Sequence, residues 1–245
     1  MKNIILVLSA FILTTSLYAQ VFLKDPLREY SALFQNSLGV NLTRINTNFN
    51  TFDVNEETYT FLKNDYLLTP EYRAVLGFLF HKPERRDIYM LRTGFNFGVQ
   101  RANLIDPQGD DLRLTTNYLS IPVDFQIRHP LTYKPLKNDN FRAVNYGFGT
   151  YLAAPIYQKL DRPENIDASG EMTFFNYLRF GLNAEISFST FNDKGHGHQF
   201  GIRTSTDFAN ILELGGTDNK LYPFFSNVGV FYNLSNSYYK KKEKG

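Results

Sequence analysis

Residues 89–100 decide the fold, and they read YMLRTGFNFGVQ. Apolar and polar side chains alternate along this segment with a period of two. The apolar positions are Tyr89, Leu91, Phe95, Phe97 and Val99, and the opposite positions are Arg92, Gly94, Asn96, Gly98 and Gln100. Successive side chains of a β-strand point to opposite faces, so this alternation predicts a strand with one apolar face and one polar face.

The same alternation recurs along most of the chain. It predicts strands at 37–46, 71–81, 89–100, 119–128, 143–154, 177–188, 199–208 and 224–234. A tilted strand of about ten residues is long enough to cross the hydrocarbon core of a bilayer. We therefore expect an all-β fold, an eight-stranded antiparallel up-and-down transmembrane β-barrel that occupies residues 37–235.

The placement of lysine indicates which face of the predicted strands points outward. A soluble lipocalin-like barrel would alternate in the same way, with its apolar face inside and its polar face in water. A strand face in water normally carries Lys and Glu. All 13 Lys of the chain fall outside the eight predicted strands, whose polar face is instead rich in Gly, Asn, Gln, Ser and Arg. This pattern favours an apolar face toward lipid and a polar lumen.

The composition of the 245 residues agrees with a membrane barrel and excludes several other classes. The chain holds 23 Phe and 16 Tyr, yet its mean hydropathy is −0.31. In a barrel wall the lipid-facing residues are averaged with lumen-facing polar ones, which explains this combination. The absence of Cys excludes disulfide scaffolds and Cys-ligated metal centres. The 26 Lys and Arg against 24 Asp and Glu leave +2, so we expect no nucleic-acid partner.

The N-terminus has the pattern of a secretory signal peptide. Lys2 precedes an apolar stretch over residues 4–13, and small residues follow, which places the expected cleavage between Ala19 and Gln20. The alternative is an N-terminal membrane anchor, but the segment is short and lacks a basic stop-transfer cluster. We expect residues 1–19 to be removed, 20–36 to form a periplasmic segment that could open with a short helix at 25–28, and 236–245 to form a basic periplasmic tail. The predicted location is the outer membrane of a Gram-negative bacterium.

The predicted connections alternate in length. Long connections at 47–70, 102–117, 157–176 and 209–221 alternate with those at 82–87, 130–142 and 190–197. Transmembrane barrels have long extracellular loops and short periplasmic turns, and an even strand number brings both termini to the periplasmic side. The first set is therefore expected outside the cell, with 130–142 as one long periplasmic connection.

The predicted lumen face carries a set of charged residues. They are Arg73, Arg92, Asp124, Arg128, Arg179, Glu185, Arg203 and Asp207, five arginines against three acids. Antiparallel register makes Arg92–Asp124, Glu185–Arg203 and Arg179–Asp207 candidate neighbours. An eight-stranded barrel has just enough interior for side chains, so we expect a charge-paired plug. A proton or anion path through these charges is the alternative.

The sequence offers no convincing catalytic, metal or cofactor site. All four His, at 81, 129, 196 and 198, fall at the predicted periplasmic ends, whereas an outer-membrane lipid enzyme would need a His near the outer rim. The acidic segment 106–111 lacks the spacing of a helix-loop calcium site and is interpreted as an ordinary turn. We expect a non-enzymatic protein without cofactor.

Three segments resemble one family. Residues 118–123, which read YLSIPV, are similar to a strand opening of the PorT-like outer-membrane β-barrel proteins of Bacteroidota, and the glycine-rich segments 92–98 and 146–149 are similar to strands of that family. Ser120 stands where the family often has Glu. The resemblance implies an outer-membrane barrel, and for some members an accessory role in type IX secretion.

The functional expectation is a structural or interaction component of the cell envelope. Its partners would be outer-membrane lipid and other envelope or secretion proteins. An accessory component of a type IX secretion or envelope-assembly complex is the first alternative. A small-solute pore and an outer-membrane lipid enzyme are further alternatives, disfavoured by the crowded lumen and the positions of the His residues.

Overall fold

The computed structural model describes residues 29–47, 51–54, 57–62, 66–81, 87–131, 141–162, 165–170, 177–191, 196–213 and 223–239. The predicted signal peptide with Ala19 and Gln20, the helix expected at 25–28 and residues 240–245 of the tail lie outside these ranges. Among the described residues, no helix has the length and hydropathy required to cross a bilayer.

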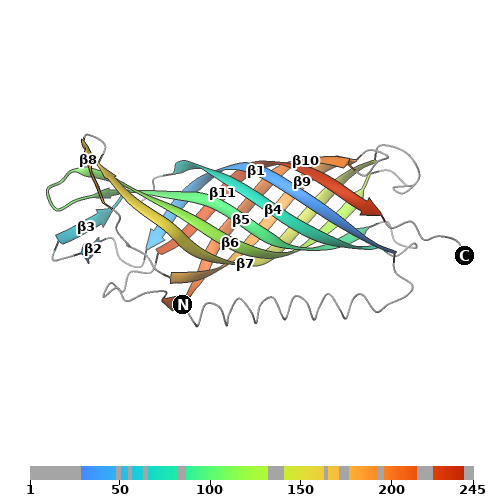
Figure 1. Cartoon of the computed structure of the whole chain (residues 1–245), viewed down its shortest axis with the longest axis horizontal. Coiled ribbons are helices and arrows are strands. Elements are labelled where there is room, and N and C mark those ends of the chain that lie inside the picture. Colours follow the sequence, from blue (N-terminus) through green and yellow to red (C-terminus); the bar gives the residue numbers. More distant parts are fainter. Residues whose placement is uncertain are drawn as a thin grey trace, which may run out of the picture.

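Eight long strands of the described chain close into an antiparallel barrel (Figure 1). They are β1 (Glu29–Thr47), β4 (Leu67–His81), β5 (Ile88–Ile105), β6 (Asp111–Pro130), β7 (Phe141–Arg162), β9 (Tyr177–Phe191), β10 (His196–Glu213) and β11 (Pro223–Tyr239). Each pairs with the next long strand in the chain, and β1 pairs with β11. The closure removes the unpaired edges of the sheet. The predicted fold class is confirmed.

The strands are longer than the alternation predicts. They run from 15 residues in β4 to 22 in β7, where about ten are expected. β1 begins at Glu29, within the segment expected to precede the barrel, and β11 continues to Tyr239. The backbone ladder needs only N–H and C=O groups, so pairing continues after the alternation of side chains ends. As a result Lys159 lies inside β7.

Three short strands extend one end of the barrel. They are β2 (Thr51–Val54), β3 (Glu57–Phe61) and β8 (Asn165–Gly170), at the left of Figure 1. β3 pairs with β5 at Thr60–Ile105 and Phe61–Leu104, beyond the last β5 residue that pairs with β4, and β8 pairs with the end of β7. At this end, the paired strands therefore extend beyond the eight-stranded wall of the barrel. We call this end the loop end and the opposite one, where β1 begins and β11 finishes, the turn end.

The connection between β5 and β6 is much shorter than the loop expected at 102–117. The strands continue until only 106–110 remain, and this turn is organised by Asp106. Its Oδ1 accepts hydrogen bonds from the backbone N–H of Gln108 at 2.9 Å and of Asp110 at 2.8 Å. Gly109 has φ of +90°, a conformation that L side chains rarely adopt. The acidic segment is thus a tight hairpin turn, as its Pro and Gly residues indicate.

The barrel interior

The interior of the barrel has apolar side chains at both ends and polar ones between. At the loop end, the described chain buries a cluster that we call the loop cap: Ile45, Tyr59, Phe61, Ala102, Leu104, Leu112, Leu114 and Phe225. At the opposite end it buries the turn cap: Leu33, Leu79, Ile88, Met90, Ala143 and Phe191. Tyr59 and Phe61 belong to β3, and the other cap residues occupy inward-facing positions of the long strands, like the polar ones but nearer to the strand ends. Neither cap was predicted from the sequence.

Glu185 is at the centre of the polar layer. Its carboxylate lies 2.7 Å from Nη1 of Arg92, 3.2 Å from Nη2 of Arg203 and 4.0 Å from Nη1 of Arg73. The amide of Gln126 donates a further hydrogen bond to it at 2.7 Å. The predicted Glu185–Arg203 neighbours are directly paired in the register of β9 and β10. One acid thus contacts three guanidinium groups from three different strands.

Asp124 is the second acid of this cluster. It forms ion pairs with Arg73 and, at 3.3 Å, with Arg92, its predicted partner across β5 and β6. The side chains of Asp124 and Arg92 expose at most 1% of their surface. Burying charges in this way is tolerated only when each has an opposite charge and hydrogen-bond partners.

Glu71 completes the cluster and was missed at the sequence level. It accepts hydrogen bonds from Arg203 at 2.6 Å, from Asn41 at 2.9 Å and from the hydroxyl of Tyr118 at 3.5 Å. The signal for it was available, because Glu71 lies two residues before Arg73 and hence on the same strand face. With Glu71 the charged residues of the eight long strands that the structure shows as buried are five arginines and four acids, which leaves +1 instead of the +2 counted from the sequence; Asp106, a fifth buried acid, belongs to the β5–β6 turn.

A second ion pair lies toward the loop cap. Arg179 donates to Asp207 at 2.7 Å, the predicted diagonal pair of β9 and β10, where a bulge shifts the register. Asp207 also accepts from the hydroxyl of Tyr151 and from the backbone N–H of Phe225, both at 2.8 Å. The guanidinium of Arg179 lies over the ring of Phe225 at 4.8 Å. This pair joins the charged layer to the loop cap.

Arg128 and a set of amides form the transition to the turn cap. Arg128 donates to Asn145 at 3.0 Å and lies 4.3 Å over the ring of Phe191. Gln35 donates to Gln199, and Gln199 donates to Ser187. The structure thus brings seven of the eight predicted charged residues into two ion-paired clusters and places Arg128 beside them, against an amide and an aromatic ring.

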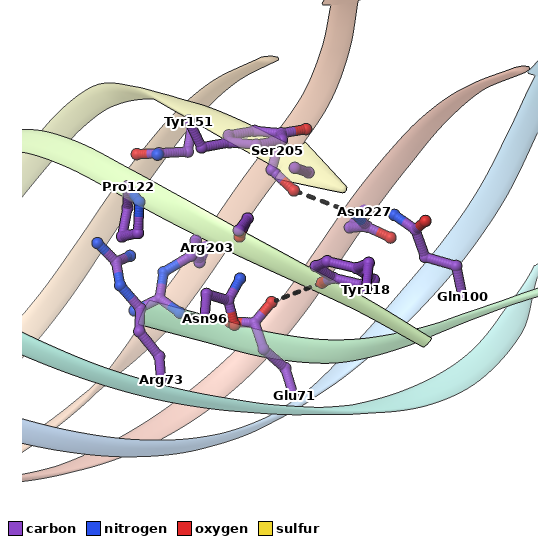
Figure 2. A pocket seen from close by; sticks show the side chains of 13 residues that line it. Glu71, Arg73, Asn96, Gln100, Tyr118, Pro122, Tyr151, Arg203, Ser205 and Asn227 are labelled. Atoms are coloured by element: carbon purple, nitrogen blue, oxygen red, sulfur yellow. Dashed lines mark hydrogen bonds and ion pairs between the residues drawn. The ribbon is translucent and has the colours of Figure 1, made fainter. Parts of the chain in front are cut away.

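A small cavity lies within the polar layer (Figure 2). The space for a water molecule is about 20 Å³, and it lies among Glu71, Arg73, Tyr118, Tyr151 and Arg203. This is enough for about one water. Asn96 and Gln100 line it, and their buried amide oxygens have no hydrogen-bond partner among the described residues, so an ordered water would satisfy them.

Inward-facing glycines allow the large rings to fill the lumen. A Cβ on Gly181 would lie 2.1 Å from the ring of Tyr151, and one on Gly98 would lie 2.4 Å from the hydroxyl of Tyr118. Small residues on one strand therefore make room for a tyrosine on its neighbour. In the described part of the chain, the lumen is thus a packed interior with space for single waters.

The outer surface has the opposite character. Leu38 and Phe208 expose 67% and 68% of their surface, whereas Arg92 and Arg128 expose 1% each. Large apolar side chains are exposed on all eight long strands, in a band across the middle of the wall. A soluble protein does not expose so much continuous apolar surface around a buried charged interior. The fold and this inverted burial define an integral membrane β-barrel.

Two of the four histidines have described contacts near the turn end. His129 pairs with Asp87 at 2.6 Å, and the ring of His198 contacts the hydroxyl of Tyr232. Both belong to strand segments near the turn end, where β4 finishes at His81 and β10 begins at His196. Among the described residues, no group of three or more His, Cys, Asp or Glu side chains is arranged to hold a metal ion.

Comparison with known proteins finds related shapes but no relative in sequence. No protein-family model and no curated protein matches the chain. The crystal structure of Neisserial surface protein A (NspA) is 8% identical, with 82% of this chain and 96% of that chain covered and a TM-score of 0.34.

Two further solved structures show the same weak likeness. The translocator domain of the autotransporter NalP from Neisseria meningitidis is 9% identical, with 95% and 96% of the two chains covered and a TM-score of 0.30. The Pseudomonas putida toluene transporter TodX is 7% identical, with 84% and 89% covered and a TM-score of 0.21.

Proposed function

We propose that this chain is a sealed, non-enzymatic outer-membrane barrel that serves the cell envelope as a structural or interaction component. One observation carries the proposal: the described lumen is filled by ion pairs and closed by an apolar cap at each end. In this proposal the loop end faces the outside of the cell and the turn end faces the periplasm.

The caps are the main argument against a pore. A hydrated ion entering from either side would first meet a layer of Leu, Ile, Phe and Met side chains, which offers no hydrogen bonds to replace its water. It would then meet guanidinium and carboxylate groups that already neutralise one another. Passage would require both layers to rearrange together, so we expect no steady conductance.

The same features argue against an enzyme. A lipid-modifying barrel needs a nucleophile and a base that reach the bilayer surface, and the described acids of the charged layer are inside the wall and paired with arginines. His129 and His198 lie at the turn end, away from the proposed outer leaflet. What remains accessible is the raised sheet of the loop end, which supports a role in contacts with other molecules.

Electrical recording from the folded, full-length protein in planar bilayers tests the proposal. We expect folded protein, recognised by heat-modifiable gel mobility, to insert without discrete current steps. A reproducible single-channel conductance from the same preparation would contradict the sealed lumen. The matched control is a variant with both caps weakened, Leu104→Ala with Met90→Ala, which should show transient currents if the caps exclude ions.

A further inference from the structure

The outer surface of the loop end carries basic side chains immediately above the apolar band. Inward-facing residues alternate with outward-facing ones along β5, β6 and β7, and the outward side chains here are at least partly exposed. In the pairing register, Val99, Asn117 and Tyr157 form one row across the three strands, and Arg101, Thr115 and Lys159 form the next row toward the loop end. The row after that contains Asn103, Arg113 and Asp161, so an acid is the register partner of Arg113 on β7.

These rows are at the depth of lipid headgroups. Two residues of a strand advance by about 7 Å, so Arg101 and Lys159 are one such step beyond the last apolar and aromatic row. Aromatic rings mark the interface in membrane barrels, and the charged headgroups begin just outside it. Arg101, Arg113 and Lys159 therefore face the level where lipid phosphates are found.

The basic side chains are concentrated on one side of the barrel. Arg44 on β1 extends the set toward β4 and lies over the ring of Tyr66. The described outward positions toward the loop ends of β9, β10 and β11 are Leu178, Phe180, Thr206, Phe208, Phe224 and Ser226, none of them Lys or Arg. The sector from β1 through β7 is thus the one that can attract an anion.

Two of these arginines differ from those in the lumen. Arg73, Arg92, Arg179 and Arg203 each form an ion pair with a buried carboxylate. Within the described part of the chain, Arg101 instead donates to the backbone oxygen of Leu68 and Arg113 to the amide oxygen of Asn103, both at 3.5 Å. Neither has a described ion pair, and with Lys159 they place three positive charges against the one negative charge of Asp161, which leaves these two rows at +2.

We propose that Arg101, Arg113 and Lys159 form a binding site for the phosphorylated headgroup of an outer-leaflet lipid. Arginine suits this role because its planar guanidinium donates two parallel hydrogen bonds to a phosphate. The lipid chains would lie along the apolar band below, on Phe97 and Leu119. The site rests on the proposed orientation of the barrel, with its loop end in the outer leaflet.

The experiment measures lipid bound to the folded, full-length protein by native mass spectrometry. The probe is bisphosphorylated lipid A, compared with the same lipid after removal of its phosphates and with inorganic phosphate as competitor. We expect wild type to retain the phosphorylated form preferentially. The double variant Arg101→Gln with Arg113→Gln should retain about tenfold less, because two charges near an anionic surface act together.

Two controls separate the site from the fold. Arg142→Gln removes an exposed arginine at the turn end of β7 and should retain lipid like wild type. Arg113→Gln alone removes an exposed side chain whose described hydrogen bond is to Asn103, so it should fold fully and lose part of the binding. Heat-modifiable mobility confirms that each variant is a folded barrel, so loss of the barrel itself is distinguished from loss of the site.

Three results would overturn the proposal. The first is equal retention of the phosphorylated and dephosphorylated lipid by wild type. The second is equal loss in the Arg142→Gln control and in the double variant. The third is complete displacement by inorganic phosphate, which would indicate a site for the free anion instead of a lipid.

Discussion

Among the described acids of the charged layer, Glu185 contacts the most arginines, because its one carboxylate contacts three guanidinium groups at once. Its neutral replacement would leave those guanidiniums with only Asp124 and Glu71 as counter-charges, in a part of the lumen that excludes bulk water. An uncompensated charge in such a place is costly, and structures respond by repacking or by admitting water.

The variant Glu185→Gln tests this residue. It keeps the shape of the side chain, and we expect it to lower the free energy of unfolding by about 3–5 kcal/mol, the usual cost of breaking a buried pair. Urea titration of protein folded in vesicles, followed by gel mobility, measures the change. Asp87→Asn is the matched control, since its pair with the partly exposed His129 should contribute less than about 1 kcal/mol. Equal effects of the two changes would contradict the assignment.

Gly181 is a second residue whose role depends on space. Because a Cβ there would overlap the ring of Tyr151, Gly181→Ala should displace that ring from Asp207. Overpacking of this kind costs about 1–3 kcal/mol. Gly39→Ala is the comparison, since its nearest contact would be a backbone oxygen at 3.2 Å, which needs a smaller adjustment. The same unfolding assay applies, and a Gly181→Ala variant as stable as wild type would show that the lumen has spare room.

Much of the charged layer could be predicted from the sequence, because a strand has a fixed period and an antiparallel pair has a fixed register. Arg92 and Asp124 are paired as that register requires. Glu71 was missed because it is at the start of its segment, where alternation is brief. The contacts of Glu185 with Arg73 and Arg92 could not be predicted either, because they cross the lumen between strands that are not neighbours. The register of an antiparallel pair relates only the residues of adjacent strands.

At the scale of elements, the positions of the strands were predicted better than their lengths. The apolar alternation marks the part of a strand that meets lipid, and it stops where the band stops. The pairing of β5 with β6 continues to Asp111 without it. The caps were not predicted because Leu104 and Met90 are apolar residues at positions of the polar face. Near the strand ends, such residues only seem to break the alternation of period two.

The β5–β6 turn gives a prediction at this scale. Asp106→Ala removes the acceptor of two backbone N–H groups, each hydrogen bond contributing about 0.5–1.5 kcal/mol net. We expect faster hydrogen exchange at the amides of Gln108 and Asp110, with the barrel strands unchanged. Asp111→Ala, which alters the exposed neighbour at the start of β6, should leave those amides protected. Protection that survives in Asp106→Ala would refute the role of this side chain.

At the scale of the whole molecule, the chain is a membrane barrel with its polar groups inside, which explains a mean hydropathy of −0.31 beside 39 Phe and Tyr. The resemblance to PorT-like proteins stays a prediction, as no family model matches the chain. The signal peptide is likewise untested, because its residues lie outside those described.

The cost of placing a charge on the outer surface should depend on its position relative to the apolar band. Val230 lies on the outer face of β11, level with Val40 and Ile202, and is 48% exposed. Val230→Arg should lower the free energy of unfolding in lipid vesicles by about 2–4 kcal/mol, and Thr115→Arg, at the headgroup level, by about 0–1 kcal/mol. Equal costs at the two positions would mean that the band is not at the centre of the bilayer.

The central claim is that the apolar face points to lipid, and the absence of Cys allows it to be tested directly. A single cysteine introduced as Val230→Cys can carry an environment-sensitive fluorophore in the full-length protein folded into vesicles. If the apolar face points to lipid, we expect a blue-shifted emission that is quenched by lipids with brominated acyl chains and is insensitive to iodide in the water. Strong quenching by iodide with no effect of the brominated lipids would contradict it.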